Sequence, residues 1–155
     1  MIEYRKGNLF EAEGPNTILV HACNTQGSWG AGIATEFAKR YPQYYKDYRD
    51  KCNKYSKTLL GMAIQFRGMT NNPGQAIACL FTSKGYGAER DSEKSILIRT
   101  QSAVECLLGT LPEDVEIHSP KINSGLFGVP WEKTEAVIDG CLIHYPEVKW
   151  VIWEL

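Results

Sequence analysis

Two glycine-rich segments, residues 24–33 and 122–131, have the features of anion-binding loops. Each follows a short run of strand-forming residues and leads directly into a pattern typical of a helix. Glycine permits positive φ angles and lets a ligand approach the backbone closely, and the free N–H groups at a helix start attract anions. Two such units in one small sheet can hold a diphosphate from both sides. The pattern therefore predicts a nucleotide-like ligand.

The glycine spacing separates these loops from two common nucleotide-binding motifs. The first loop has glycines at positions 27, 30 and 32, which match neither G-x-G-x-x-G nor the P-loop, and no Lys-Ser or Lys-Thr pair follows. A kinase or a standard dinucleotide-binding enzyme is therefore disfavoured. A β-branched residue at position 32 should abolish ligand binding while leaving the fold intact. We expect four glycines to tolerate substitution poorly: Gly30, Gly32, Gly125 and Gly128.

The second loop also carries an aromatic ring, Phe127, and a proline at position 130. The proline suits the first turn of a helix. An apolar ring in a glycine loop needs a surface to cover, and the face of a ribose or a base would serve. This ring therefore supports the nucleotide interpretation.

Polar residues near the loops are the candidates for catalysis. Hydrolysis of a phosphate monoester needs groups that bind phosphate, position water and protonate the leaving oxygen. Asn24 can orient a ribose hydroxyl or a water molecule. The polar segment 82–91 follows a predicted strand, and it can close over the distal end of the ligand and supply Lys84, Arg90 or Asp91. Asp91 also precedes the longest predicted helix, so helix capping is an alternative role for it.

The cysteines and histidines have structural interpretations. Five cysteines are an odd number and form no C-x-x-C, so we expect neither a zinc site nor a disulfide framework. Cysteines inside apolar runs are typical of buried, reduced thiols. The cysteines are Cys23, Cys52, Cys79, Cys106 and Cys141. A structural role is also the default for the histidines, which are His21 at the cleft edge, His118 and His144.

The composition is that of an ordinary globular domain. The chain has 155 residues, of which 43% are apolar and 23% charged. The formal net charge of −1 leaves no electrostatic footprint for nonspecific binding to nucleic acid or to a membrane. Residues 1–6 contain no signal core, and no apolar run approaches membrane-spanning length. We expect a single domain over residues 1–155 that is a monomer, located in the cytoplasm with the nucleus as a second compartment.

Strand-like and helix-like stretches alternate along the chain, which is typical of a mostly parallel sheet covered on both faces. Strands are predicted at 2–5, 17–20, 59–66, 75–81, 115–118 and 149–153, and helices at 33–40, 42–55, 92–108 and 130–143. Strong turn residues at 71–74 join two of the strands, so the sheet is predicted to be mixed. The helix at 42–55 should bury Tyr45, Tyr48 and Cys52, and the helix at 92–108 should bury Ile96, Thr100, Ala103 and Leu107. The expected fold is a three-layer α/β/α sandwich with its ligand crevice beyond the carboxyl ends of the strands.

Four segments resemble the successive signature segments of the macrodomain family: residues 6–9, 21–24, 29–34 and 123–131. Within that family the chain most resembles the fungal ADP-ribose 1″-phosphate phosphatases, and the resemblance runs from residue 1 to residue 155. It implies binding of ADP-ribose or ADP-ribose 1″-phosphate and removal of the phosphate of the latter, a by-product of tRNA splicing chemistry. It requires no metal or organic cofactor.

The resemblance also assigns residues to the substrate. Residues 7–9 would border the adenine, and Cys23 and Asn24 would reach the distal ribose. Many macrodomains have Asp where this chain has Asn8, which can accept a hydrogen bond but carries no charge. The substrate-binding set is Gly7, Asn8, Leu9, His21, Cys23, Asn24, Ser28, Trp29, Gly30, Ala31, Gly32, Ile33, Asn123, Ser124, Gly125, Leu126, Phe127, Gly128 and Val129.

Two alternatives to the phosphatase remain open. In another macrodomain branch, a lysine after a similar strand attacks the anomeric carbon and removes ADP-ribose from protein or DNA, and residues 81–84 are similar to that segment. The enzymes of that branch that act on protein have an Asp where this chain has Phe127, which argues against a protein substrate. A module that binds ADP-ribose without turnover would share the same loops. The catalytic candidates across these alternatives are Asn24, Lys84 and Asp91.

Overall fold

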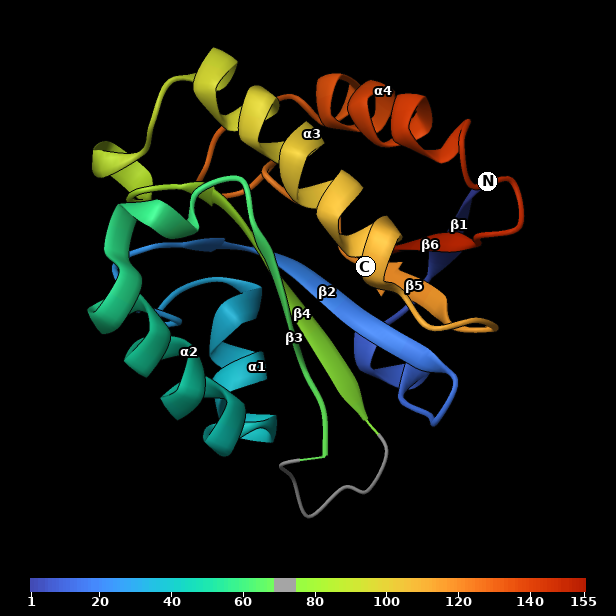
Figure 1. Ribbon diagram of the computed structural model, residues 1–155, viewed down its shortest axis with the longest axis horizontal. Coiled ribbons are helices and arrows are strands. Elements are labelled where there is room, and N and C mark those ends of the chain that lie inside the picture. Colours follow the sequence, from blue (N-terminus) through green and yellow to red (C-terminus); the bar gives the residue numbers. More distant parts are fainter. Residues whose placement is uncertain (69–74) are drawn as a thin grey trace.

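A six-stranded mixed sheet lies between two pairs of helices in the computed structural model, which describes residues 1–68 and 75–155 (Figure 1). The strands are β1 (Ile2–Lys6), β2 (Thr17–Asn24), β3 (Ala63–Phe66), β4 (Ala76–Ser83), β5 (Glu116–Ser119) and β6 (Trp150–Glu154). The helices are α1 (Ile33–Arg40), α2 (Pro42–Tyr55), α3 (Glu93–Thr110) and α4 (Trp131–Leu142). Short 3₁₀ helices span Leu9–Ala12, Ser56–Leu59 and Gly87–Glu89.

The strand order is β1-β6-β5-β2-β4-β3, and every neighbouring pair is parallel except β3 with β4. Figure 1 shows α1 and α2 on one face of the sheet and α3 and α4 on the other. This arrangement confirms the predicted three-layer α/β/α sandwich with a mixed sheet. It also places the parallel strands β2, β4 and β5 side by side, so that their carboxyl ends meet at one edge.

Alternation along the central strands divides the core into two layers, because successive residues of a strand point to opposite faces. In β2, Leu19 packs with the α1 and α2 side chains, whereas Ile18 and Val20 pack with α3 and α4. All eight residues of β4 are buried, as expected for a strand covered on both faces.

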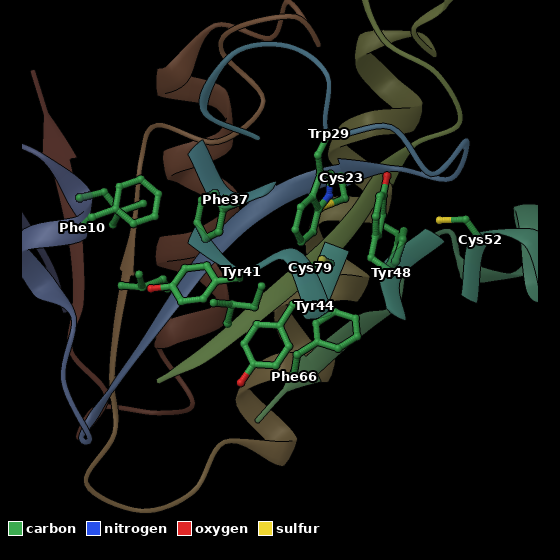
Figure 2. Close-up of a cluster of buried hydrophobic side chains, with 14 of the residues drawn as sticks. Phe10, Cys23, Trp29, Phe37, Tyr41, Tyr44, Tyr48, Cys52, Phe66 and Cys79 are labelled. Carbon is green, nitrogen blue, oxygen red and sulfur yellow. The ribbon is translucent and has the colours of Figure 1, made fainter. Parts of the chain in front are cut away.

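Aromatic rings fill the layer between the sheet and α2 (Figure 2). Tyr44, Tyr48 and Cys52 are the buried residues of α2, whereas Tyr45, which the sequence placed on this face, is partly buried and packs against the same core cluster. Residues 44, 48 and 52 follow one another at four-residue intervals along a single stripe of the helix. The ring of Tyr45 lies one position around the helix and stacks on Trp29 with centroids 5.1 Å apart.

The predicted strand at 59–66 differs from the observed one at its start. The strand expected from residue 59 begins only at Ala63, because the Ser56–Leu59 turn and Gly61, with φ of +83°, precede it. The predicted turn at 71–74 lies outside the described residues.

The predicted buried face of α3 is confirmed at all four positions. Among the described residues, none of the helices is long and apolar enough to span a membrane.

Two aliphatic truncations on α3 test this layered packing. Leu107 is completely buried, whereas Ile98 is 61% exposed. We expect Leu107→Ala to lower the free energy of unfolding by about 2–5 kcal/mol, and Ile98→Ala to change it by no more than about 0.5 kcal/mol. Urea unfolding followed by circular dichroism measures both. Similar losses from the two variants would contradict the placement of α3 on the sheet.

Candidate functional site

A cleft of about 340 Å³ opens at the carboxyl ends of β2 and β5, between the two glycine-rich loops. Thirteen residues of the predicted substrate-binding set line it: His21, Cys23, Asn24, Ser28, Trp29, Ala31, Gly32, Ile33, Asn123, Ser124, Gly125, Leu126 and Phe127. Six further lining residues were not predicted: Ala22, Ala34, Tyr86, Pro120, Lys121 and Ile122. The strand–loop–helix pattern therefore identified both walls.

The first loop is held by Asn24, which ends β2 and is almost completely buried. Its Oδ1 accepts hydrogen bonds from the backbone N–H groups of Gln26 (3.0 Å) and Ser28 (3.3 Å) and from the Tyr48 hydroxyl (3.0 Å). Its Nδ2 donates to the carbonyl oxygen of Ser28 (2.9 Å). The carboxamide that was predicted to orient a ribose hydroxyl or a water molecule therefore makes its hydrogen bonds within the first loop and to Tyr48.

Helix α1 begins directly at the cleft wall. Its N-cap, Gly32, has φ of +62° and ψ of −148°, and no side chain caps the helix there. The first N–H groups of an α-helix have no partner within the helix and attract anions. Because Ile33 and Ala34 line the cleft, this end of α1 is available to an anionic ligand.

The second loop is held by Asn123, whose φ is +67°. Its Oδ1 accepts from the Thr82 hydroxyl (2.9 Å), and its Nδ2 donates to the hydroxyls of Thr100 (2.9 Å) and Thr134 (3.4 Å). One buried side chain therefore joins the loop to β4, α3 and α4. A backbone bond from Val129 N–H to the Asn123 carbonyl (2.9 Å) closes the loop.

Phe127 has a different environment from the one its sequence context suggested. Only 8% of the residue is exposed, and it packs against Ile96 and Val129 in a small core cluster. The ring therefore already has a protein surface to cover. It reaches the cleft as part of the wall.

The segment after β4 connects the two loops across the cleft. Tyr86 lines the cleft, and its hydroxyl lies 3.4 Å from the Ser28 Oγ on the first loop. The next N–H, that of Gly87, donates to the carbonyl of Leu126 on the second loop (3.1 Å). This segment was predicted from the sequence as a cover for the ligand, but Tyr86, which lines the cleft, was not among the predicted site residues.

Lys84 and Asp91 do not line the cleft. The Asp91 carboxylate accepts from Arg99 Nη1 (2.7 Å) and from the backbone N–H of Lys84 (2.9 Å), and the Lys84 Nζ lies 3.7 Å away. Asp91 is not the cap of α3, since Ser92 fills that position and accepts from the Ser95 N–H. The aspartate instead ties both ends of the segment 84–91 to α3.

Six residues of the predicted set lie outside the cleft lining: Gly7, Asn8, Leu9, Gly30, Gly128 and Val129. The Asn8 side chain accepts a hydrogen bond from the Phe10 N–H (3.0 Å) and so caps the 3₁₀ helix after β1. The Gly7 N–H donates to the Glu154 carbonyl (2.7 Å), and Leu9 is buried in the core. In this structure, local roles account for all three.

A cluster of sulfur and imidazole atoms lies beneath the cleft floor. The Cys23 Sγ is 3.5 Å from His21 Nε2, and both residues are buried with Cys79. Burial disfavours the Cys23 thiolate, but a hydrogen bond with Cys79 and the charge of His21 outweigh it and lower the pKa of Cys23 to about 6. Burial raises the pKa of Cys79. Spacing along the chain gave no sign of this cluster, because sheet pairing brings its members together.

The family model for the Macro domain matches residues 20–138. The chain belongs to the Macro domain family. Two proteins named ADP-ribose 1″-phosphate phosphatase are similar to it over most of both chains. The one from Lodderomyces elongisporus is 41% identical and the one from Saccharomyces cerevisiae 37%; in both comparisons the match covers 89% of this chain and 91% of the relative. The resemblance read from the sequence segments is thereby confirmed.

Solved macrodomain structures have the same fold as this Macro domain chain. The macrodomain of Mycobacterium tuberculosis DarG superposes with a TM-score of 0.80 at 25% identity, over 100% of this chain and 98% of that one. Residues 20–138 of the family match include both loops and the segment that connects them.

Two glycine substitutions distinguish backbone strain from ligand approach. The Gly32 backbone lies in a region that is essentially restricted to glycine, so Gly32→Val should cost about 1–3 kcal/mol of stability and distort the first loop. Gly125 has no positive φ, and a Cβ there would meet nothing within 4 Å. Gly125→Ala should therefore leave stability unchanged and weaken ADP-ribose binding, because the added methyl group occupies the space that the ligand enters.

Thermal unfolding and titration calorimetry with ADP-ribose measure the two effects separately. Normal ADP-ribose affinity in Gly32→Val would contradict the role given to the first loop. Normal affinity in Gly125→Ala would mean that the ligand does not approach the second loop at that residue.

Proposed function

We propose that this chain binds ADP-ribose derivatives and hydrolyses the phosphate ester of ADP-ribose 1″-phosphate to give ADP-ribose and inorganic phosphate. The single observation that carries the proposal is the cleft walled by two glycine-rich loops at the carboxyl ends of parallel strands. Relatives that carry the name of this phosphatase at 37–41% identity support the reaction.

The charges of the cleft suit an anionic ligand. Its described lining residues include no aspartate or glutamate, and they include one lysine, Lys121. With a chain net charge of −1, attraction must come from local groups, namely this ammonium and the N–H groups at the start of α1. The Lys121 ammonium also pairs with the Glu154 carboxylate at 2.7 Å, which offsets part of its charge.

The rim of the cleft is apolar on both walls. Ile33 on the first wall is 38% exposed, and Leu126 on the second is 45% exposed. Apolar side chains on opposite walls suit the face of a base or a ribose, while the polar floor and loops suit phosphates and hydroxyls. A nucleotide-sized ligand combines these features.

The groups that can act on the phosphate are hydroxyls rather than the residues first considered. Asn24 shapes the first loop, and Asp91 and Lys84 brace the connecting segment, so we propose that all three position the site. The Tyr86 and Ser28 hydroxyls lie 3.4 Å apart across the cleft wall. They can donate hydrogen bonds to the phosphoryl oxygens and stabilise the charge that develops in the transition state.

A comparison of three substrates tests the reaction. Purified protein is incubated with ADP-ribose 1″-phosphate, with mono-ADP-ribosylated protein and with ADP-ribosylated DNA, and the release of phosphate and of ADP-ribose is measured. We expect phosphate release from the first substrate. Binding of ADP-ribose without turnover of any of the three substrates would instead indicate a module that only binds ADP-ribose.

The same assay with Lys84→Ala addresses the lysine-dependent glycohydrolase. Because the Lys84 ammonium lies beside Asp91 and outside the cleft lining, we expect phosphate release to persist in this variant. ADP-ribose release from DNA or protein that disappears in Lys84→Ala would overturn the phosphatase in favour of the glycohydrolase.

Tyr86→Phe tests the hydroxyl proposed to contact the phosphate. We expect kcat for phosphate release to fall by about tenfold or more, because the transition state loses one hydrogen-bond donor. The affinity for ADP-ribose, measured by calorimetry, should stay within a few-fold of the parent value. Unchanged kcat would exclude Tyr86 from transition-state stabilisation.

A further inference from the structure

An ion pair lies at one end of the cleft, beside the carboxyl ends of β5 and β6. Lys121 lines the cleft two residues after β5, and Glu154 is the last residue of β6. The Lys121 Nζ lies 2.7 Å from the Glu154 Oε2, and the two side chains are 38% and 34% exposed. Because the lysine lines the cleft and the carboxylate contacts its ammonium, Glu154 lies at the border of the cleft.

This pair is remote from the hydroxyls proposed to contact the phosphate. Ser28 follows β2 and Tyr86 follows β4, whereas the pair belongs to β5 and β6. In the strand order β6-β5-β2-β4, the first and last strands are three intervals apart, or about 14 Å. A ligand whose reacting phosphate lies at Tyr86 therefore extends along the strand ends toward Lys121 and Glu154.

The two charged groups suit different parts of such a ligand. An ammonium attracts phosphate, whereas a carboxylate repels phosphate and accepts hydrogen bonds from hydroxyl groups. The Glu154 Oε2 contacts Lys121, and Oε1 has no hydrogen-bond donor among the described residues. Acidic side chains that follow strands bind ribose hydroxyls in the unrelated dinucleotide-binding folds.

The order of the groups in ADP-ribose matches the order of these side chains. The adenosine ribose is attached directly to the diphosphate and carries two adjacent hydroxyls. A carboxylate that lies one contact beyond a phosphate-binding ammonium therefore falls where these hydroxyls lie. A phosphate in place of the 2′-hydroxyl would bring like charge against the carboxylate and remove the donor that it needs.

Building on the proposed function, we propose that Lys121 and Glu154 make the site selective for adenosine with a free 2′-hydroxyl. The Lys121 ammonium donates to the adjacent phosphate, and the Glu154 carboxylate accepts from the 2′-hydroxyl. The chain thereby takes ADP-ribose derivatives and rejects those that carry a phosphate on the adenosine 2′-oxygen. This repulsion is a function of Glu154 that the glycine-rich loops do not supply.

Titration calorimetry on the parent chain tests the selectivity. The probes are ADP-ribose, ADP-ribose with a phosphate on the adenosine 2′-oxygen, and ADP-ribose that lacks the adenosine 2′-hydroxyl. We expect ADP-ribose to bind at least about tenfold more tightly than either of the other two, because each of them leaves the carboxylate without its donor. Equal affinity for ADP-ribose and its 2′-phosphate would overturn the proposal.

Two glutamine variants provide the matched comparison. Glu154→Gln keeps the shape of the side chain, removes the repulsion and leaves the Lys121 charge unpaired. We expect it to narrow the preference for ADP-ribose over the 2′-phosphate by about tenfold or more. Glu93 forms a comparable pair with Lys133 at 3.0 Å, outside the cleft lining. Glu93→Gln should keep the parent preference, and equal preferences in the two variants would refute the role of Glu154.

Lys121→Met separates the two members of the pair. It leaves the Glu154 carboxylate alone at the cleft, so it should weaken binding of ADP-ribose and weaken binding of the 2′-phosphate further. Unchanged ADP-ribose affinity would contradict the phosphate contact of Lys121. Thermal unfolding of each variant should match the parent, since both side chains are partly exposed.

The same titrations distinguish this selectivity from the proposed function. A parent chain that binds no ADP-ribose would overturn both. A parent chain that binds ADP-ribose and releases phosphate from ADP-ribose 1″-phosphate, but whose preference Glu154→Gln does not change, would overturn the selectivity alone.

Discussion

Two buried asparagines turn the ends of neighbouring parallel strands into ligand loops, and the cleft depends on their hydrogen bonds. A carboxamide has two donor hydrogens and an oxygen with two lone pairs, so one side chain can replace several ladder bonds where a strand stops. Asn24 does this for β2 within its own loop. Asn123 does it after β5 by reaching hydroxyls on three other elements. The first asparagine shapes one wall locally, and the second ties the other wall to the whole molecule.

The segment 84–91 completes the frame because it contacts both loops and is itself anchored. The Asp91 side chain is only 11% exposed, so its pairing with Arg99 is screened less than a surface ion pair. That anchor holds the short stretch in which Tyr86 reaches Ser28 and Gly87 reaches Leu126. A charged residue outside the cleft thereby determines where a hydroxyl inside the cleft lies.

The strand β2 serves two purposes through simple alternation. Its last residues form the floor of the cleft, and the side chains of His21 and Cys23 also belong to the face covered by α1 and α2. There His21 stacks on Phe37 with ring centroids 4.0 Å apart, and Tyr48 packs between Trp29 and Phe81. This aromatic layer excludes water from the sulfur cluster and supports the first loop through the Tyr48 hydroxyl. Packing beneath the cleft and recognition within it are therefore coupled.

The sequence by itself determined the layered fold, the two loops and the bounds of α1 and α2, because these follow from local periodicity, glycine spacing and proline position. Tertiary structure decided what each side chain contacts. Tyr44 is fully buried, whereas the predicted Tyr45 is only partly buried. The Phe127 ring packs against Ile96 and Val129 of the protein itself. Asp91 pairs with Arg99 instead of capping α3. Cys79 meets Cys23 only through the register of β2 with β4. Local patterns specify which element forms, whereas the partner of a side chain depends on distant segments whose register and packing no short stretch of sequence encodes.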